Sequence, residues 1–282
     1  MSLRIGNSAW PLLCLVVLLS AAEGWPREGE PRLVDTASVA LGAGVEVSHG
    51  DYGVGADATV VSLPLSLYWR PHDRMDLTFE APLLYLSSKS DSGVVVTSAG
   101  GAGRRRGAGR AGKAAAKAET VQEYGIGDVN MTAGWILAPE GEKIPKVRPT
   151  LYVKAPTGDL DRGLGTGTLE AGPGLSVSKW IGVVQLFAEG AYIFQDSRSD
   201  YAGRNYVGYL GGAGVQTTDR LFVSLLAKGS SARSEGADAQ GEVRLLLNFL
   251  QSRRVLWEIY GAAGFTDASP AFGGGLMMSY QF

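Results

Sequence analysis

Two histidines are the natural starting point in a search for catalysis, because histidine exchanges protons near neutral pH. They are His49 and His72. His49 follows Ser48, but neighbouring residues on a strand point to opposite faces, so the two cannot act as a nucleophile and its base. His72 and Asp73 resemble an acid/base pair, but they lie in a short turn, at the wrong end for surface proteolysis. We therefore expect no enzymatic activity.

Metal chemistry has little support in the sequence. The only cysteine, Cys14, excludes a disulfide scaffold and a multi-cysteine metal site. Asp159, Asp161 and the glycine-rich segment 163–167 offer oxygen ligands of the kind that Ca²⁺ takes, although aspartate and glycine are also typical of an ordinary turn. We expect no metal and no cofactor.

The strongest functional signal is a set of charged and polar residues that recur in the middle of predicted strands. They alternate with apolar residues, so on each strand they share one face. If the sheet closes, this face surrounds a lumen, where opposite charges can pair into a plug or line a narrow aqueous path. An acidic excess would favour cations or neutral solutes. The candidate lumen-lining residues are Glu46, Arg70, Asp76, Glu80, Asp128, Asn130, Arg148, Lys154, Glu170, Glu189, Lys228, Glu242, Arg244 and Glu258.

The elements that position these residues are β-strands. In residues 242–249, for example, Glu242, Arg244 and Asn248 alternate with apolar residues. Twelve segments show this pattern, which predicts an all-β fold. Their spans are 37–49, 57–70, 74–87, 123–138, 146–156, 168–180, 182–195, 204–217, 220–230, 239–250, 253–265 and 270–282.

The composition agrees with an all-β chain and excludes several other classes. Forty glycines argue against a helical protein, because glycine destabilises helix interiors. A formal net charge of -2 gives no overall nucleic-acid-binding signature. Although 45% of the residues are hydrophobic, the mean hydropathy is only +0.04, and no segment resembles an ordinary globular core.

The first 24 residues have the organisation of a secretory signal peptide. Arg4 precedes an apolar run from Leu12 to Leu19, and small residues follow, so we expect cleavage after about Ala22 or Gly24. The run is too short to span a bilayer as a helix. The remaining residues, 25–282, are predicted to form a single exported domain without cysteine.

Connections after the odd-numbered strands are mostly longer than those after the even-numbered strands. This alternation is typical of an antiparallel up-and-down transmembrane β-barrel with short periplasmic turns and long extracellular loops. The longest connection, 88–120, is a low-complexity extracellular loop, and its part 99–118 is strongly basic. This segment could contact anionic lipopolysaccharide, or it could be a solvated insertion without a partner.

Aromatic residues near the strand ends favour a membrane as the surroundings of the barrel. Trp69, Trp135, Trp180 and Trp257 fall near the short-turn ends of their strands, and tryptophan prefers the membrane–water interface. The last strand ends in Phe282, which resembles the signal that the barrel-assembly machinery reads. We therefore expect a bacterial outer-membrane protein, with outer-membrane lipid and lipopolysaccharide as its surroundings.

Three short motifs carry a family resemblance. They are Gly125–Asp128, Pro156–Asp159 and Gly163–Gly167, and residues 175–179 follow them. Together they resemble the outer-membrane proteins named for the meta-pathway of phenol degradation, which are described as transporters of hydrophobic or aromatic compounds. The resemblance covers residues 120–282 and implies a similar cargo here, although the basic insertion 99–118 is not a feature of that family.

The sequence thus predicts a twelve-stranded outer-membrane barrel that acts as a passive channel for small molecules. It has no predicted nucleic-acid partner, and the sequence does not define the oligomeric state. One alternative is a structural or surface-interaction barrel with a plugged lumen, in which the basic loop binds an anionic partner. A weaker alternative is a soluble exported β-protein.

Overall fold

A computed structural model describes residues 38–53, 57–89, 94–96, 102–104, 119–198 and 201–282. The predicted signal peptide lies outside these residues, as does most of the basic segment 99–118. The strands are β1 Val39–Gly50, β2 Ala58–His72, β3 Met75–Lys89, β4 Val94–Val96, β5 Ala102–Arg104, β6 Thr120–Ile126, β7 Val129–Trp135, β8 Lys146–Ala155, β9 Glu170–Ile181, β10 Val184–Gln195, β11 Tyr206–Thr218, β12 Leu221–Ser230, β13 Gln240–Ser252, β14 Val255–Gly264 and β15 Phe272–Gln281.

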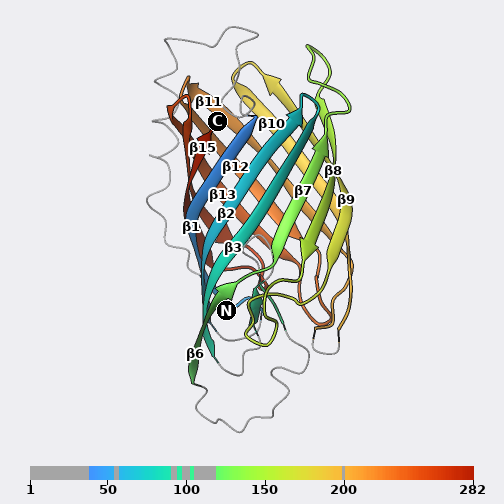
Figure 1. Ribbon diagram of the computed structural model, residues 1–282, viewed down its shortest axis with the longest axis vertical. Coiled ribbons are helices and arrows are strands. Elements are labelled where there is room, and N and C mark those ends of the chain that lie inside the picture. Colours follow the sequence, from blue (N-terminus) through green and yellow to red (C-terminus); the bar gives the residue numbers. More distant parts are fainter. Residues whose placement is uncertain (1–37, 54–56, 90–93, 97–101, 105–118, 199–200) are drawn as a thin grey trace, which may run out of the picture.

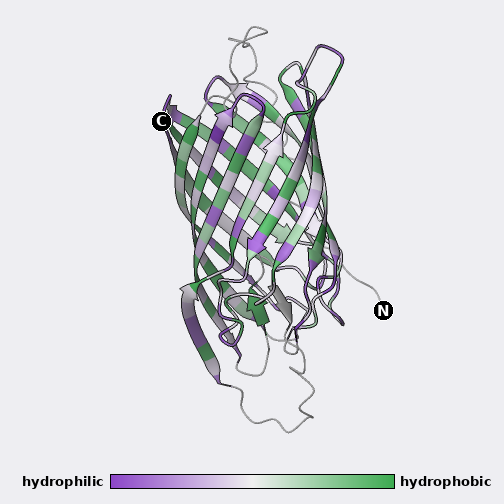
Figure 2. Ribbon diagram, turned by 45° about the vertical axis from the view of Figure 1, so that its right-hand side comes forward, coloured by the Kyte–Doolittle hydropathy of each residue, from purple (hydrophilic) through white to green (hydrophobic). Residues whose placement is uncertain are grey.

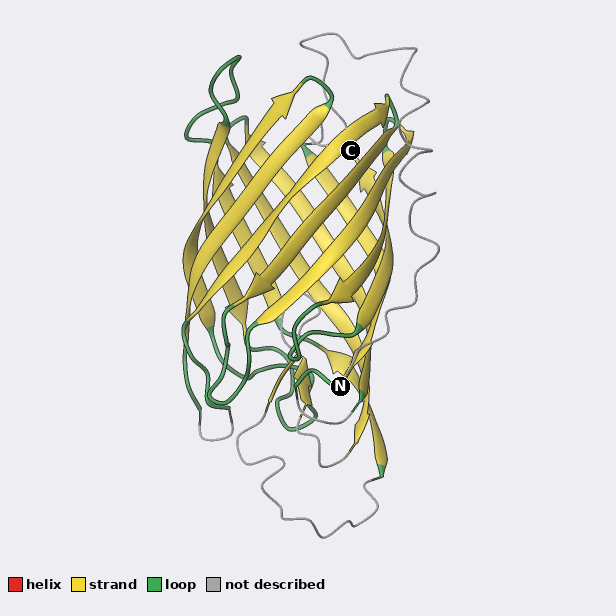
Figure 3. Cartoon of the chain, turned by 180° about the vertical axis from the view of Figure 1, so that it is seen from behind, coloured by secondary structure: helices red, strands yellow, loops and turns green. Residues whose placement is uncertain are grey.

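The main sheet closes on itself as an antiparallel barrel (Figure 1). β1 pairs with both β2 and β15, and β2 also pairs with β3, so the described sheet has no open end. Its thirteen strands occupy twelve wall positions, because β6 and β7 lie one after the other along β3. The predicted twelve-stranded barrel is confirmed, and the strands run obliquely along its wall (Figure 3).

β6 and β7 are separated by a β-bulge that the sequence pattern does not reveal. Glu80 of β3 pairs with Asn130, and Leu83 pairs with Ile126. Three steps along β3 therefore face four steps along β6 and β7, and one extra residue is accommodated at Gly127–Asp128. Beyond the bulge, β6 pairs only with β3, whereas β7 pairs with both β3 and β8.

The outer face of the barrel is apolar over much of its height (Figure 2). Large hydrophobic side chains are exposed at alternate positions, as at Leu41, Val45 and Val47 of β1 or at Leu245, Leu247 and Phe249 of β13. A surface of this extent is stable against lipid, and closure leaves no strand edge unpaired in the hydrocarbon. Within the described part of the chain, no helix is long and apolar enough to cross a membrane.

Two details of the fold differ from the sequence-based expectation. The connection 88–120 is not entirely irregular, because Val94–Val96 pairs with Ala102–Arg104 as a small second sheet. Trp180 does not lie on the lipid-facing side, because its ring packs against Phe222, which is almost completely buried inside the barrel. The other three predicted interface tryptophans face outward or lie at the rim.

Candidate functional site: the barrel lumen

All fourteen candidate residues lie on the inner side of the barrel wall. Thirteen of them occupy inward strand positions, as Glu46 does between the exposed Val45 and Val47, and Asp128 lies in the bulge between β6 and β7. Three of them meet in a buried cluster at the long-loop end of the lumen. Five others form ion pairs farther inside. The remaining six lie at other inward positions, and of these Glu80 and Asn130 face each other across β3 and β7; the six are Glu46, Arg70, Glu80, Asn130, Glu189 and Glu258.

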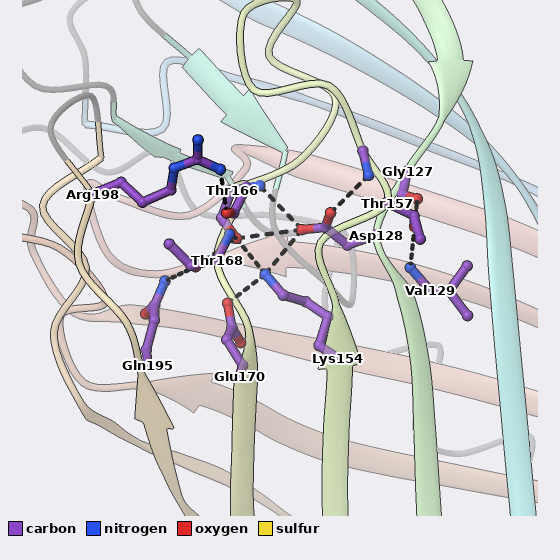
Figure 4. A network of polar contacts seen from close by, with 12 residues as sticks. Gly127, Asp128, Val129, Lys154, Thr157, Thr166, Thr168, Glu170, Gln195 and Arg198 are labelled. Atoms are coloured by element: carbon purple, nitrogen blue, oxygen red, sulfur yellow. Dashed lines mark hydrogen bonds and ion pairs between the residues drawn. The ribbon is translucent and has the colours of Figure 1, made fainter.

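The buried cluster consists of Asp128, Lys154 and Glu170 (Figure 4). The Lys154 ammonium is fully buried and lies 2.9 Å from Asp128 Oδ2 and 2.5 Å from Glu170 Oε1. Lys154 also donates a hydrogen bond to Thr166, and the Tyr206 hydroxyl donates to Glu170 Oε2 over 2.7 Å. All three protons of the ammonium thus have an acceptor, as the burial of a charge requires.

Asp128 ties the connection between β8 and β9 to this cluster. Its carboxylate accepts hydrogen bonds from the backbone nitrogens of Gly158 (2.9 Å) and Thr166 (3.0 Å). The two amides belong to opposite ends of the loop, so one carboxylate fixes both of them. We call the loop 157–169 the latch loop, because the buried cluster fastens it inside the barrel.

The β-bulge provides a second attachment for the latch loop. The Thr157 hydroxyl donates to the Gly127 carbonyl over 2.7 Å and accepts from the Val129 amide over 2.9 Å. The two backbone groups lie at the end of the β7–β8 pairing, where Val129 is the partner of Ala155. The side chain of Thr157 therefore satisfies two backbone groups beside the bulge.

A hydrophobic cap covers the cluster at the long-loop end. Val94, Val95 and Val96 of β4 are almost completely buried, and Val96 donates a backbone hydrogen bond to Gly163 of the latch loop over 2.8 Å. The cap residues around them are Tyr52, Ala58, Val60, Leu84, Leu86, Leu160, Leu164 and Tyr201. Loops from four connections thus fill this mouth of the lumen.

Tyr52 and Gly163 show how the cap fits together. Tyr52 shares a 2.8 Å hydrogen bond with Ser48, and burial raises the pKa of Tyr52 to about 12, so its phenol is neutral at physiological pH. Gly163 has a φ of 73°, and a Cβ there would lie 2.6 Å from the Val94 carbonyl oxygen. Glycine therefore permits both the turn and the close contact with β4.

An ion pair between Asp76 and Arg148 crosses the inner face of β7. Arg148 Nε donates to Asp76 Oδ2 over 2.8 Å, and a second guanidinium nitrogen contacts the other carboxylate oxygen. A Cβ at Gly134 of β7 would collide with this guanidinium. Gly134 therefore provides the space through which the Arg148 side chain of β8 reaches Asp76 of β3.

A second charged group joins β12 and β13. Glu242 Oε1 lies 3.3 Å from the Lys228 ammonium and 2.6 Å from Arg244 Nε. The Arg244 guanidinium also lies 4.3 Å from the ring centre of Tyr260, a cation–π contact. Glu46 approaches this group from β1 and lines a small pocket with Glu242, Arg244 and Tyr260.

Below the buried cluster lies a cavity of about 290 Å³. Tyr206 is shared by the two sites, since it lines the cavity and hydrogen-bonds Glu170 of the cluster. Glu80 and Asn130 contribute from one side of the lumen, and Glu189 and Leu210 contribute from the other. The cavity therefore adjoins the buried cluster and is also lined by Arg233, Ser269 and Pro270 of other connections.

Sequence reasoning missed the apolar part of the inner wall. Leu210 stands in register between Glu189 and Lys228, so it faces the lumen. Phe222 and Leu226 of β12 are also buried inside, and a Cβ at Gly214 would collide with the Phe222 ring. The alternation along β12 could have revealed them. Phe222 and Leu226 lie an even number of positions away from Lys228, so they face the lumen as Lys228 does.

The two histidines lie far from any catalytic grouping of the described residues. His49 Nδ1 lies 2.9 Å from the Thr59 hydroxyl and its ring packs near Phe272, on the outer face, whereas Ser48 points inward to Tyr52. His72 stacks on Trp135. Asp159 accepts backbone hydrogen bonds from Asp161 and Arg162, as in an ordinary Asx turn, and no metal-ligand cluster occurs in the described ranges.

The solved structures similar to this chain are outer-membrane barrels. An outer-membrane channel from Pseudomonas putida F1 matches with a TM-score of 0.64 and 14% identity, over 91% of this chain and 100% of the other. The NanC porin matches with a TM-score of 0.49 and 9% identity, over 86% and 98%. The transport unit of the autotransporter AIDA-I from Escherichia coli has a TM-score of 0.48 and 13% identity, over 95% and 96%.

No protein-family model matches the chain, and no curated protein matches it by sequence. The similarity to the Pseudomonas putida channel therefore establishes the fold, that of a closed outer-membrane β-barrel.

Proposed function

We propose that this protein is an outer-membrane channel through which small molecules diffuse passively. The observation that carries the proposal is the inner wall, where charged residues and a cavity of about 290 Å³ lie inside a barrel whose outer face is apolar. Ionisable side chains at several levels of a lumen can line an aqueous path for small solutes.

The cap and the latch loop define a closed conformation of this channel. A solute entering from the long-loop end meets the cap first and the Asp128–Lys154–Glu170 cluster next. Opening requires that the latch loop moves away from Asp128, because that carboxylate holds Gly158 and Thr166 together. Passage is then diffusion, with the latch loop controlling access and the inner charges controlling selectivity.

The proposed cargo is a small molecule with a hydrophobic or aromatic body. Leu210, Phe222 and Leu226 give the inner wall an apolar strip, which supports this choice. The family named for the meta-pathway of phenol degradation remains our proposed assignment. In support of it, the motifs Gly125–Asp128, Pro156–Asp159 and Gly163–Gly167 meet in space around the latch loop.

Planar-bilayer recording tests the channel function. We expect small conductance steps from the purified protein and larger or longer openings from Lys154→Met, because that change removes the central cation of the cluster. In a salt gradient the reversal potential should indicate cation preference, since Glu46, Glu80, Glu189 and Glu258 add negative charge to the lumen. If neither folded protein conducts ions nor passes small aromatic solutes into liposomes, the channel proposal is wrong.

The cap also favours a second candidate function, a barrel with a permanently plugged lumen that acts at the cell surface. In that case the basic loop 99–118 would bind an anionic partner such as lipopolysaccharide. Deletion of the loop distinguishes the two functions. A channel should keep its solute flux after the deletion, whereas a surface-binding barrel should lose its partner.

A further inference from the structure

Lys228 extends from β12 into the cavity of about 290 Å³ that adjoins the buried cluster. Its neighbours in register are Leu210 of β11 and Glu242 of β13. Glu80 of β3 lines the same cavity. In the cyclic order of the wall, five strand positions separate β12 from β3 in either direction, through β13, β14, β15, β1 and β2 or through β11, β10, β9, β8 and β7. Lys228 and Glu80 therefore lie on opposite sides of the lumen.

The nearest acid to Lys228 is shared with a second base. Lys228 Nζ lies 3.3 Å from Glu242 Oε1, and Arg244 Nε lies 2.6 Å from the same oxygen. A carboxylate carries one negative charge, so Glu242 cannot neutralise both bases. The positive charge of Lys228 is thus only partly offset by its neighbour and acts on other acids of the lumen.

Three further acids lie within electrostatic reach of the Lys228 ammonium. They are Glu80 of β3, Glu258 of β14 and Glu46 of β1. Together with Glu242 they come from four different strands, so one cation balances acids from separate parts of the wall. Such interactions act over several ångströms because the interior of a protein screens charge less than water does.

The other bases of the inner wall are committed to local partners or lie elsewhere. Arg148 contacts both carboxylate oxygens of Asp76, and Lys154 is enclosed in the buried cluster. Arg70 lies near the short-turn end of β2. Loss of Lys228 would therefore leave several acids around one cavity with less positive charge near them.

We propose that Lys228 determines the charge selectivity of the lumen. The cavity is lined by three acids and two bases, a formal balance of -1, and removal of Lys228 would change it to -2; the five residues are Glu80, Glu189, Glu242, Lys228 and Arg233. A more negative lumen attracts cations and excludes anions. The inference deepens the proposed channel function and rests on it for ion passage, but the effect of Lys228 on the cavity can be measured without conduction.

Reversal potentials in a potassium chloride gradient test the selectivity. Lys228→Gln should raise the potassium-to-chloride permeability ratio about fivefold or more, because a unit charge close to the path acts on both ions. Lys228→Arg keeps the charge and should stay within about twofold of the unmodified protein. Arg70→Gln removes an equal charge at the short-turn end of β2, where the ions are better hydrated and screened, and should also stay within about twofold.

A single thiol in the cavity gives a second readout that needs no conduction. Ala191 lines the cavity, and Ala191→Cys in a Cys14→Ser background places one cysteine there. Cationic and anionic methanethiosulfonates of matched size report the local potential through the ratio of their reaction rates with the folded barrel in detergent. Adding Lys228→Gln should raise the cationic-to-anionic rate ratio about fivefold, whereas adding Lys228→Arg should not change it. A heat-dependent shift in electrophoretic mobility verifies that each variant is folded.

The outcomes separate this inference from the channel proposal. Ratios that Lys228→Gln leaves unchanged, or that Arg70→Gln changes equally, would overturn the role of Lys228. A changed rate ratio in a barrel that never conducts would uphold that role in the cavity and refute the channel. A conducting barrel in which Lys228→Gln alters neither ratio would do the reverse. A thiol that neither reagent reaches, in a barrel that does not conduct, would refute both.

Discussion

Lys154 is the residue on which the closed conformation depends. Its ammonium is removed from water and is balanced by Asp128 and Glu170, which lie on neighbouring wall strands. Two acids around one base leave an excess negative charge, which the amides of Gly158 and Thr166 and the hydroxyl of Tyr206 offset through hydrogen bonds. The latch loop is therefore part of the electrostatic balance and not only a steric cover.

The first prediction concerns this balance. Lys154→Met leaves two buried carboxylates facing each other, a change that costs about 3–5 kcal/mol in comparable sites. The barrel can relieve the repulsion by releasing the latch loop, so trypsin should cleave after Arg162 much faster than in the unmodified protein. Gel electrophoresis of timed digests of the folded barrel measures the cleavage.

Glu123→Gln is the matched control for this prediction. Glu123 pairs with Arg162 of the same loop over 2.6 Å, but both side chains are substantially exposed, so this pair adds little stability. Cleavage should change little in this variant. Equal protection of the Lys154→Met protein and the unmodified protein would contradict the role of the buried cluster.

At the scale of elements, the bulge between β6 and β7 makes the latch possible. At the bulge Asp128 faces the lumen, and the Gly127 carbonyl and the Val129 amide both bond to a hydroxyl of the latch loop. Thr157 provides this hydroxyl from the first turn of the latch loop. With a regular strand here the latch loop would lose this second attachment.

The second prediction tests the bulge contact. Thr157→Val keeps the side-chain shape but removes both hydrogen bonds, and because the contact is partly open to water each loss costs about 0.5–1.5 kcal/mol. We expect faster amide hydrogen exchange at Val129 and Gly158, measured by mass spectrometry. Thr157→Ser retains the hydroxyl and should restore most of the protection; no difference between valine and serine would rule out the hydrogen bonds as the cause.

At the scale of the whole molecule, the apolar residues cover the outside of the barrel. Because the medium around them is lipid, the effect of a charged substitution depends on its depth. Leu225 lies in the middle of β12 and is 57% exposed, whereas Ile181 lies at the short-turn end of β9 and is 61% exposed. In water, two such similarly exposed residues would tolerate lysine equally well.

The third prediction uses this pair. Leu225→Lys should lower the free energy of unfolding by about 2–4 kcal/mol, and Ile181→Lys by about 0–1 kcal/mol, because a charge near the interface can reach water. Denaturant titration in phospholipid vesicles, followed by tryptophan fluorescence, measures both values. Equal effects at the two positions would contradict a membrane-spanning barrel with this depth assignment.

The fourth prediction concerns assembly. Phe282 is 67% exposed, and its ring packs against Tyr280. We propose that Phe282→Ala lowers the fraction of folded protein in the outer membrane. Phe249→Ala, which removes an exposed aromatic ring from β13, is the control and should assemble normally. Equal assembly of the two variants would refute this role.

Much of the architecture was predictable from the sequence, for a local reason. A strand with lipid on one side and a lumen on the other must alternate apolar and polar residues, and β13 shows this with Glu242, Arg244 and Asn248 on its inner face. The short turn at Gly182, with a φ of 61°, also follows from local conformation. The inward orientation of Phe222 and Trp180 was not predicted, because the sequence alone does not distinguish an apolar residue that faces the lumen from one that faces lipid.

The sequence by itself determined the strands, their inward charges and the lipid-facing surface, since these depend on neighbours along one chain segment. Only the tertiary structure decided which charges meet. Asp128, Lys154 and Glu170 belong to three adjacent wall positions, and a loop whose sequence reads as an ordinary turn enters the lumen to join them. Long-range closure brings such groups together, and burial then makes their pairing obligatory because an unpaired charge away from water is strongly unfavourable.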